Sequence, residues 1–354
     1  MKEIIVTKAE AGQRFDRYLK KYMPEAASGF LHKMLRKKNI KLNGNKAEGN
    51  EKIREGDSIQ IYFSEETLAK FTGRTGRNVS SVSKDERPVG KKKPSTGKRE
   101  ESLRRQVHLL YATEDILIFH KPAGMLTQKA RPEDDSLNDY LLDYCRKNDI
   151  IKEGTTAFRP SVANRLDRNT SGIVAAGKTL AALQTLSAMF RERSVRKYYL
   201  CLVYGVVSGE KKIRAFLTKD GRTNRVTVER KKGTPNSGAD ISDGKESFIE
   251  TEYRALRTDG EVTLMEVHLI TGKTHQIRAH LAAEGYPIIG DYKYGNRDVN
   301  DIFRRKYGLT SQLLHSYRLC FPECEGELAE LSGKEIKAPV PELFRKICAD
   351  RGVM

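Results

Sequence analysis

No stretch of this 354-residue sequence stays apolar for anywhere near the roughly 20 residues that a membrane-spanning helix needs. The first residues also lack the apolar centre of a secretion signal, because Lys8 and Glu10 interrupt their short apolar stretch. We therefore expect a cytoplasmic protein that does not insert into a membrane.

Cysteine is scarce and scattered: the chain has five, at positions 145, 201, 320, 324 and 348. A disulfide-stabilised secreted domain would show an even and dense set. Cys320 and Cys324 are four residues apart, but no His or Cys pair nearby completes a zinc site. We expect reduced thiols and no bound metal.

Two glycine-rich signatures are also missing, the dinucleotide-binding pattern and the phosphate-binding P-loop. Their absence argues against chemistry that depends on a nucleotide cofactor. It also disfavours a methyltransferase, in which a glycine-rich loop follows a strand. We expect no cofactor.

Acidic residues are too few to balance the basic ones, so the net charge is +18, with 65 Lys and Arg against 47 Asp and Glu. A field of that sign favours a polyanionic partner, either a nucleic acid or an acidic membrane surface. The charge is concentrated near the N-terminus, because residues 1–105 carry +12 of it.

Composition divides the chain into two folded units joined by a basic flexible linker at residues 64–105. From residue 72 to residue 101, large apolar side chains are nearly absent, while Gly, Ser, Lys and Arg abound. Such a segment cannot bury enough surface to offset the entropy of ordering it. The predicted units are therefore residues 1–63 and residues 106–354.

The first unit is predicted to contain two helices and a small sheet. Phe15, Tyr18, Leu19 and Tyr22 recur at helical spacing, and a second helix follows Ser28. Residues 40–46 alternate around an Asn-Gly turn, and a strand follows at 59–63. The second helix places three basic side chains on its outer face and C-terminal end: Lys33, Arg36 and Lys37. They are suited to bind RNA, or they are simply solvated cations that the helix dipole favours at that end.

The second unit is predicted to be rich in strands. Apolar patterns place strands at 107–111, 116–119, 199–206, 225–229, 248–255 and 263–269, and helices at 136–148 and 180–192. The order is not a regular alternation of strand and helix, so we predict a mixed α+β fold with a largely antiparallel sheet. Residues 230–246 are expected to form a mobile hairpin tip or an insertion.

The most informative segment is residues 164–172, with the sequence NRLDRNTSG. Asp, Asn, Ser and Gly also form turns for local reasons, so the segment could simply be a turn that enters a strand. However, an Asp between Arg165 and Arg168 is expected to stay ionised, as a nucleophile or a base must.

Residues 165–172 resemble the active-site motif of the RluA family of RNA pseudouridine synthases. Four other segments are similar to that family's motifs in the same order: 120–125 (HKPAGM), 195–205 (VRKYYLCLVYG), 271–281 (TGKTHQIRAHL) and 287–295 (PIIGDYKYG). Residues 14–57 resemble a small RNA-binding domain, the S-four-like domain, which is common at the N-terminus in this family.

The resemblance implies a role for each matching residue. Asp167 would be the nucleophile, and Arg278 would pair with it. Tyr199 would lie against the uracil face, by stacking alone or with a further part in proton removal. Ile277 would line the uracil pocket, and Arg165 would fill the space that the flipped nucleotide leaves. His275 is expected to be structural. Two residues depart from the family pattern, Asn164 and Lys273, and each can alter how the RNA backbone is bound.

The function thus expected is the isomerisation of uridine to pseudouridine in structured RNA. Large-subunit ribosomal RNA or its precursor is favoured by the N-terminal unit, and we expect a monomer. The alternative is a catalytically silent RNA-binding protein that uses the same basic surface. The intact set of Asp167, Tyr199 and Arg278 disfavours that alternative.

Overall fold

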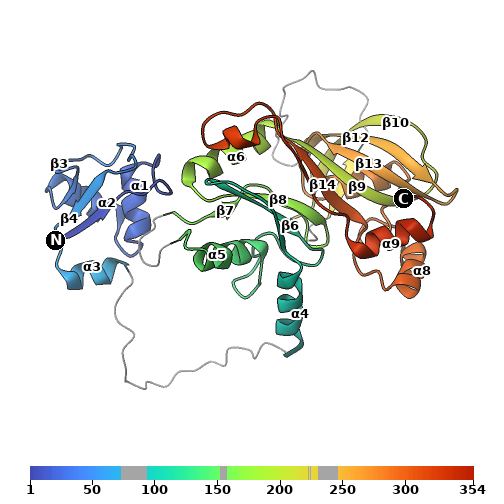
Figure 1. Cartoon of the computed structure of the whole chain (residues 1–354), viewed down its shortest axis with the longest axis horizontal. Coiled ribbons are helices and arrows are strands. Elements are labelled where there is room, and N and C mark those ends of the chain that lie inside the picture. The colour runs from blue at the N-terminus through green and yellow to red at the C-terminus, as the bar shows by residue number, and fades with distance from the viewer. Residues whose placement is uncertain (73–93, 152–157, 222, 224, 230–245) are drawn as a thin grey trace.

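The computed structural model describes residues 1–72, 94–151, 158–221, 223, 225–229 and 246–354. These ranges contain a four-stranded sheet in the N-terminal unit and an eleven-stranded sheet in the rest of the chain. The small sheet and its helices lie beside one end of the larger unit (Figure 1). None of the described helices is long and apolar enough to cross a membrane.

The N-terminal unit has the predicted helices and hairpin. Helices α1 (Phe15–Tyr22) and α2 (Ser28–Arg36) pack on a sheet of order β1-β4-β2-β3, with bounds Lys2–Ile5, Ser58–Ile61, Ile40–Leu42 and Asn45–Lys46. Asn43 and Gly44 connect β2 to β3 with φ angles of 50° and 75°. Both angles are positive, as a tight two-residue hairpin requires, which explains the Asn-Gly pair.

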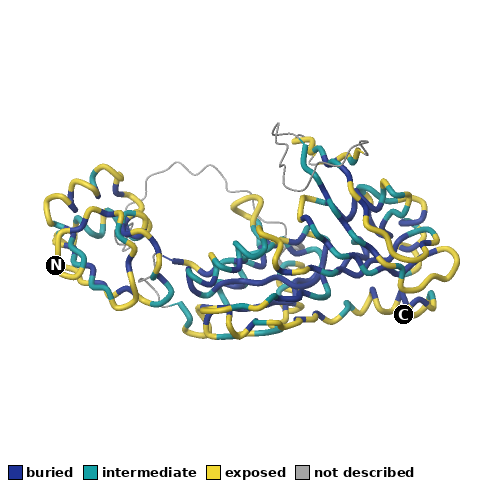
Figure 2. Tube along the Cα trace, turned by 90° about the horizontal axis from the view of Figure 1, so that it is seen from above, coloured by how far each residue is buried: buried dark blue, intermediate teal, exposed yellow. Residues whose placement is uncertain are grey.

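One apolar core holds this unit together. Its fully buried side chains include Phe15, Tyr18 and Leu19 of α1, which stand on one face of the helix. Figure 2 shows the exposed outer surface of the unit around these buried segments. Lys33, Arg36 and Lys37 lie on that exposed surface, so α2 presents its cations to solvent.

The predicted linker is wrong at both of its ends. Helix α3 (Glu65–Thr72) belongs with the N-terminal unit, because Leu68 and Phe71 pack against its core. Helix α4 (Pro94–Arg105) belongs with the larger unit, where Leu103 packs on the core. Arg104 binds the Asp135 and Asp143 carboxylates at 2.6 and 2.7 Å. A few apolar and ion-pairing residues therefore order segments whose average composition is polar.

The two units also touch directly. The Lys8 ammonium lies 3.0 Å from the Glu114 carboxylate and 3.2 Å from that of Asp115. The Ala9 carbonyl accepts a hydrogen bond of 3.1 Å from the Leu180 amide at the start of a helix of the larger unit.

The large sheet has the order β11-β10-β12-β13-β9-β14-β8-β6-β5, with β15 paired to β14 and β7 paired to β8. Within it, only the β14–β8 pair of the described neighbours is parallel, so the predicted mixed, largely antiparallel α+β fold is confirmed. The strands that sequence patterns predicted are β5 (His108–Ala112), β6 (Ile116–Lys121), β9 (Arg196–Tyr204), β11 (Val226–Glu229), β12 (Glu246–Thr258) and β13 (Val262–Leu269). The remaining strands are β7 (Ser161–Val162), β8 (Ser171–Gly177), β10 (Glu210–Lys219), β14 (Leu314–Cys320) and β15 (Glu335–Lys337).

Helices cover this sheet and its ends. The two predicted helices are α5 (Leu137–Lys147) and α6 (Leu180–Glu192), and the further ones are α7 (Gln276–Ala283), α8 (Arg297–Tyr307), α9 (Glu342–Asp350) and the 3-10 helix η1 (Gly326–Leu331). Residues 230–245 of the expected insertion lie outside the described residues. All five cysteines are free thiols.

Two histidines are buried in the middle of the large sheet. His315 of β14 is fully buried and shares a 2.9 Å hydrogen bond with the Ser171 hydroxyl, and its ring centre lies 5.6 Å from that of His120. Burial lowers the pKa of His315 to about 3, and the neighbouring His120 adds to this effect. Burial also lowers the pKa of His120 to about 4, and His108 and Lys121 add to that shift. Among the residues that the structure describes, neither ring nitrogen of His120 finds a hydrogen-bond partner.

These lowered pKa values predict a loss of stability in acid. In the unfolded chain both imidazoles titrate near pH 6.5, so between that pH and about pH 4 the unfolded state binds more protons. The free energy of unfolding should therefore be fully maintained above pH 6.5 and fall as the pH decreases towards 4. Replacing His120 with Phe should make this fall shallower in urea unfolding measured at several pH values.

The same replacement at His32, which is exposed on α2, is the matched control and should leave the pH dependence unchanged. Equal slopes for wild type and His120→Phe would contradict the assignment of the acid loss to this buried pair.

Candidate active site

The segment that carries Asp167 is a loop between β7 and β8. The side-chain amide of Asn164 forms hydrogen bonds that fix the start of this loop. Asn164 accepts a 2.8 Å hydrogen bond from the Ala175 amide and donates one of 3.2 Å to the Ile173 carbonyl. Both partners belong to β8, so Asn164 fixes the start of the loop to the strand that follows it. Asn164 departs from the family pattern, and its hydrogen bonds to β8 give it a local structural role.

The Thr127 hydroxyl holds the next part of the loop. It donates to the Leu166 carbonyl at 2.9 Å and accepts from the Leu166 amide at 3.1 Å. One side chain therefore satisfies both backbone groups of the residue before Asp167. This arrangement fixes the backbone direction at the point where the Asp167 side chain leaves the chain.

Beneath the loop, the fully buried Lys121 ammonium binds three backbone carbonyls. It donates to Pro122, Met125 and Arg168 at 3.0, 2.8 and 3.2 Å. Burial lowers the pKa of Lys121 to about 7, although the nearby Asp167 charge acts in the opposite direction. Lys121 therefore ties the turn that ends β6 to the residue that follows Asp167.

The Gly172 position explains why glycine ends the motif. Its φ angle is 123°, and a Cβ atom there would lie 2.1 Å from the Ser316 carbonyl oxygen of β14. No side chain fits into that space. The close approach of β8 and β14 brings the Asp167 loop beside the elements that carry the other site residues.

Asp167 is bound from far along the sequence by Arg278 of α7. The Arg278 Nη1 donates a 2.8 Å hydrogen bond to Asp167 Oδ2, while its Nε and Nη2 bind the two oxygens of Asp291 at 2.7 and 2.9 Å. Burial lowers the pKa of Arg278, but the two carboxylates outweigh that effect and raise it overall. The guanidinium is thus held in one plane by Asp291 and directed at Asp167.

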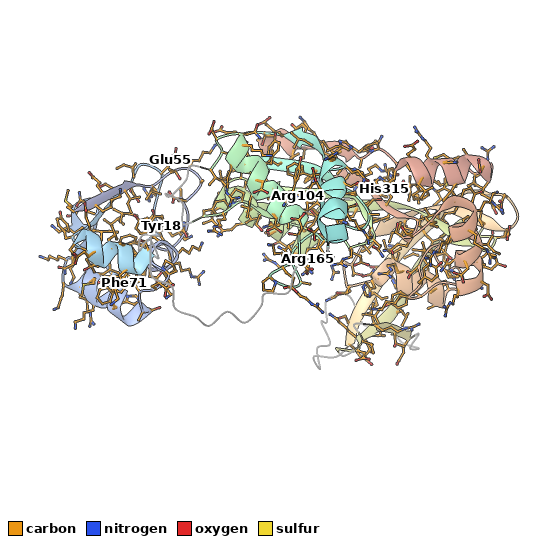
Figure 3. All side chains as sticks on the ribbon, turned by 90° about the horizontal axis from the view of Figure 1, so that it is seen from below. Tyr18, Glu55, Phe71, Arg104, Arg165 and His315 are labelled. Atoms are coloured by element: carbon orange, nitrogen blue, oxygen red, sulfur yellow. The ribbon has the colours of Figure 1, made fainter. Side chains whose placement is uncertain are left out.

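The arginines beside Asp167 in the sequence do not provide this contact. Within the described residues, neither Arg165 nor Arg168 forms an ion pair with Asp167, and Arg168 lies 3.9 Å from the Asp134 carboxylate instead. Arg165 is exposed and projects from the loop (Figure 3). Arg165 therefore remains available to a ligand.

His275 borders the same carboxylate at a longer distance. Its Nε2 lies 3.9 Å from Asp167 Oδ2, beyond hydrogen-bond range, and its Nδ1 lies 2.9 Å from the Tyr294 hydroxyl. Burial lowers the pKa of His275, although the Asp167 charge opposes the shift. A neutral ring oriented by Tyr294 agrees with a structural part for His275.

These side chains border a cavity of about 330 Å³. Its lining includes every catalytic and uracil-pocket residue that the sequence predicted: Arg165, Asp167, Tyr199, Ile277 and Arg278. The Asp167 side chain is 27% exposed, so it faces the cavity while Arg278 covers its other side. Tyr199 is buried in the wall, and burial raises its pKa to about 12.

The predicted RNA-contacting residues of α2 are not part of this cavity. Lys33, Arg36 and Lys37 lie in the N-terminal unit on the exposed side of its helix. Conversely, the sequence interpretation assigned no role to Asp291, although it stands inside the motif at 287–295. Its sequence signal was that it is the one carboxylate of this segment.

The cavity has the groups for covalent catalysis by a carboxylate. Asp167 is accessible, oriented and paired with a cation, which are the properties that a carboxylate nucleophile needs. The described residues contain no group of three or more His, Cys, Asp or Glu side chains that could hold a metal ion.

The family model described as RNA pseudouridylate synthase matches residues 115–283. The ribosomal large subunit pseudouridine synthase C of Rickettsia bellii is 31% identical over 97% of this chain and 100% of its own length. That of Vibrio vulnificus is 29% identical over 95% and 92%.

Solved structures show the same fold. Human RNA pseudouridylate synthase domain containing 4 superposes with a TM-score of 0.56 at 19% identity, covering 73% of this chain and 97% of the human chain.

The Arg278–Asp291 contact predicts that Asp291 is needed for stability. In Asp291→Asn, the amide keeps the shape of the carboxylate but loses its charge, so a buried guanidinium loses its two-point partner. We expect the free energy of unfolding to fall by about 3 kcal/mol in urea unfolding. The control Asp301→Asn removes a half-buried carboxylate that accepts a hydrogen bond from the Tyr292 hydroxyl at the surface, and it should change little. A loss equal to that of the control would show that Asp291 does not anchor Arg278.

Proposed function

The chain belongs to the RNA pseudouridine synthase family and is an isomerase that acts on RNA; from this premise we propose that it modifies uridine in large-subunit ribosomal RNA with Asp167 as the nucleophile. The observation that carries the assignment of Asp167 is its 2.8 Å contact with Arg278 at the wall of the cavity. The choice of RNA is supported by the relatives named as ribosomal large subunit synthases.

The reaction breaks the glycosidic bond of uridine, turns the freed uracil and rejoins it to the sugar through carbon five. Nothing is oxidised, and no group leaves the substrate. The site must therefore supply a nucleophile, retain the loose base, and accept the proton from carbon five. Asp167 can supply the first by attack on either the sugar or the uracil ring.

The cavity wall can retain the base. Ile277 and Tyr199 border the cavity together with Asp167, and they offer an apolar side chain and an aromatic face. Because burial raises the Tyr199 pKa to about 12, its phenol is neutral at pH 7. We therefore assign stacking on the uracil to Tyr199 in preference to proton removal by a phenolate.

Arg165 can stabilise the RNA once the uridine has left its stem. A base inside a duplex must be flipped out before its glycosidic bond can be reached. Arg165 is exposed at the cavity and forms no ion pair within the described residues, so its guanidinium is available to fill the vacated position.

The N-terminal unit is proposed to be an S-four-like RNA-binding domain that extends to Thr72. The two helices on a small sheet and the exposed Lys33, Arg36 and Lys37 support this assignment. Residues 1–105 also carry +12 of the +18 net charge, which provides affinity for phosphates without reading the sequence.

Pseudouridine mapping of total RNA from cells with and without the gene tests the substrate directly. A site in large-subunit ribosomal RNA that disappears with the gene would support the proposal. A site lost only from transfer RNA would overturn the choice of RNA and leave the reaction unchanged.

Asp167→Asn tests the nucleophile. The amide preserves shape and hydrogen bonding but cannot attack, so we expect pseudouridine formation to be abolished. RNA affinity should stay within about tenfold, or about 1.4 kcal/mol, because Asp167 does not bind the phosphates. Single-turnover assays and equilibrium binding measure the two quantities. Turnover at a good fraction of the wild-type rate would remove Asp167 from this role.

The N-terminal cations can be tested in the full chain, because α4, Lys8 and Ala9 contact the larger unit and a truncation would disturb it. The variant Arg36→Gln/Lys37→Gln should weaken RNA binding and reduce the slope of its salt dependence by about one to two. Turnover at saturating RNA should be unchanged.

Helix α9 offers a matched control, since Arg345 and Lys346 form the same exposed pair of residue types. Arg345→Gln/Lys346→Gln should leave the salt slope as in wild type. If both variants behave alike, the N-terminal unit does not provide the phosphate contacts.

A further inference from the structure

A second buried cation lines the catalytic cavity and has no part in the chemistry described above. Lys197 of β9 is 8% exposed and borders the cavity. It stands two residues before Tyr199 on the same strand, so both side chains lie on the same face of the sheet. Lys197 therefore occupies the part of the cavity wall next to the uracil-stacking residue.

The Lys197 ammonium has no protein partner in the described parts of the chain, where no hydrogen bond or ion pair involves it. Lysines are almost never buried to this extent without one. Burial lowers the pKa of Lys197 to about 8, and the charge of Arg193 adds to this effect. At neutral pH the amine is still mostly protonated, so the free protein holds a charge there at a cost in stability.

The surroundings leave this ammonium open to an anion. A Cβ atom on Gly272 would lie 3.8 Å from the Lys197 Nζ, so the glycine leaves one approach to the amine uncovered. Lys273 also borders the cavity, and its side chain forms no ion pair within the described residues. The one carboxylate in the cavity lining, Asp167, is bound by Arg278.

The chemistry of the substrate indicates which group fits. Uracil and ribose are neutral, and the anionic groups of a uridine within RNA are the phosphates on either side of it. A desolvated ammonium gains most from a full negative charge, because the attraction is strong in a low dielectric.

We propose that Lys197, with Gly272 leaving room beside it, is the binding site for a backbone phosphate that flanks the flipped uridine. The phosphate contact places the nucleotide so that its glycosidic bond faces Asp167. This assignment rests on the proposed function for the identity of the RNA. Lys197 acts as a positioning residue and takes no part in bond breaking.

Lys197→Met removes the charge and keeps an unbranched apolar stem. We expect the RNA concentration for half-maximal single-turnover rate to rise about tenfold, with the rate at saturation within threefold of wild type. The salt slope of binding should fall by about one contact, or 0.7 to 0.9. Lys197→Arg should restore part of the binding.

Stability separates this role from a structural one. Without RNA, Lys197→Met should unfold at the same temperature as wild type or a higher one, because an unpaired buried charge has been removed. The control Lys346→Met removes one exposed charge from α9 and should change neither RNA binding nor its salt slope. A lower melting temperature with unchanged RNA binding would overturn the proposal, as would a lower saturated rate with unchanged binding.

A chemical change in the RNA identifies the partner. Synthetic RNA stem-loops that span the mapped uridine would carry a neutral methylphosphonate either before or after it. One of the two should weaken binding to wild type about tenfold and weaken binding to Lys197→Met by less than twofold. Equal losses for both proteins with both RNAs would show that Lys197 contacts neither phosphate.

The binding measurement also separates this inference from the proposed function. If wild type binds the stem-loop with the expected coupling but forms no pseudouridine, the phosphate site stands and the assigned reaction or target is wrong. If wild type forms pseudouridine and the coupling is absent, the function stands and the phosphate site is wrong.

Discussion

The site depends on the ion pairs of the Arg278 guanidinium, because this one group binds two carboxylates of different kinds. Asp291 is almost fully buried and takes two of its nitrogens, whereas Asp167 is partly exposed and takes one. The buried pair fixes the plane and position of the guanidinium. The remaining nitrogen then presents a fixed charge to Asp167, so the carboxylate that we propose as the nucleophile is already oriented before the substrate binds.

A comparable arrangement holds the backbone around Asp167. Thr127 and Lys121 bind backbone groups of the loop, at Leu166 and Arg168, while Asn164 within the loop binds the backbone of β8. Lys121 is a buried cation with carbonyl partners, and Lys197 is a buried cation without them. Backbone carbonyls bind the Lys121 ammonium, whereas the Lys197 ammonium remains free to bind a ligand. Burial alone would not distinguish them.

Sequence patterns predicted the fold class, most strands of the large sheet and the residues that meet in the cavity, because amphipathic spacing and ordered motifs are local signals. They missed α7, although Arg278 lies on it, because that helix buries its polar residues together with its apolar ones and so shows no periodic contrast between an apolar and a polar face. They misplaced the linker ends because Phe71 and Arg104 each contact residues outside the segment, and average composition does not record such contacts. Asp291 was missed because its partner lies in another motif, and pairing between distant segments is visible only in the folded chain.

The arginines next to Asp167 show that the cations nearest in sequence need not be the ones that pair with a carboxylate. Proximity predicted that Arg165 and Arg168 keep the carboxylate ionised, yet the contact comes from a residue 111 positions away. If the flanking arginines bound Asp167, they would have to leave it whenever RNA required them. Assigning the carboxylate to a guanidinium anchored by Asp291 removes that competition. Under the proposed function, the loop can then present an exposed arginine to the RNA and a fixed carboxylate to the uridine at the same time, from positions two residues apart.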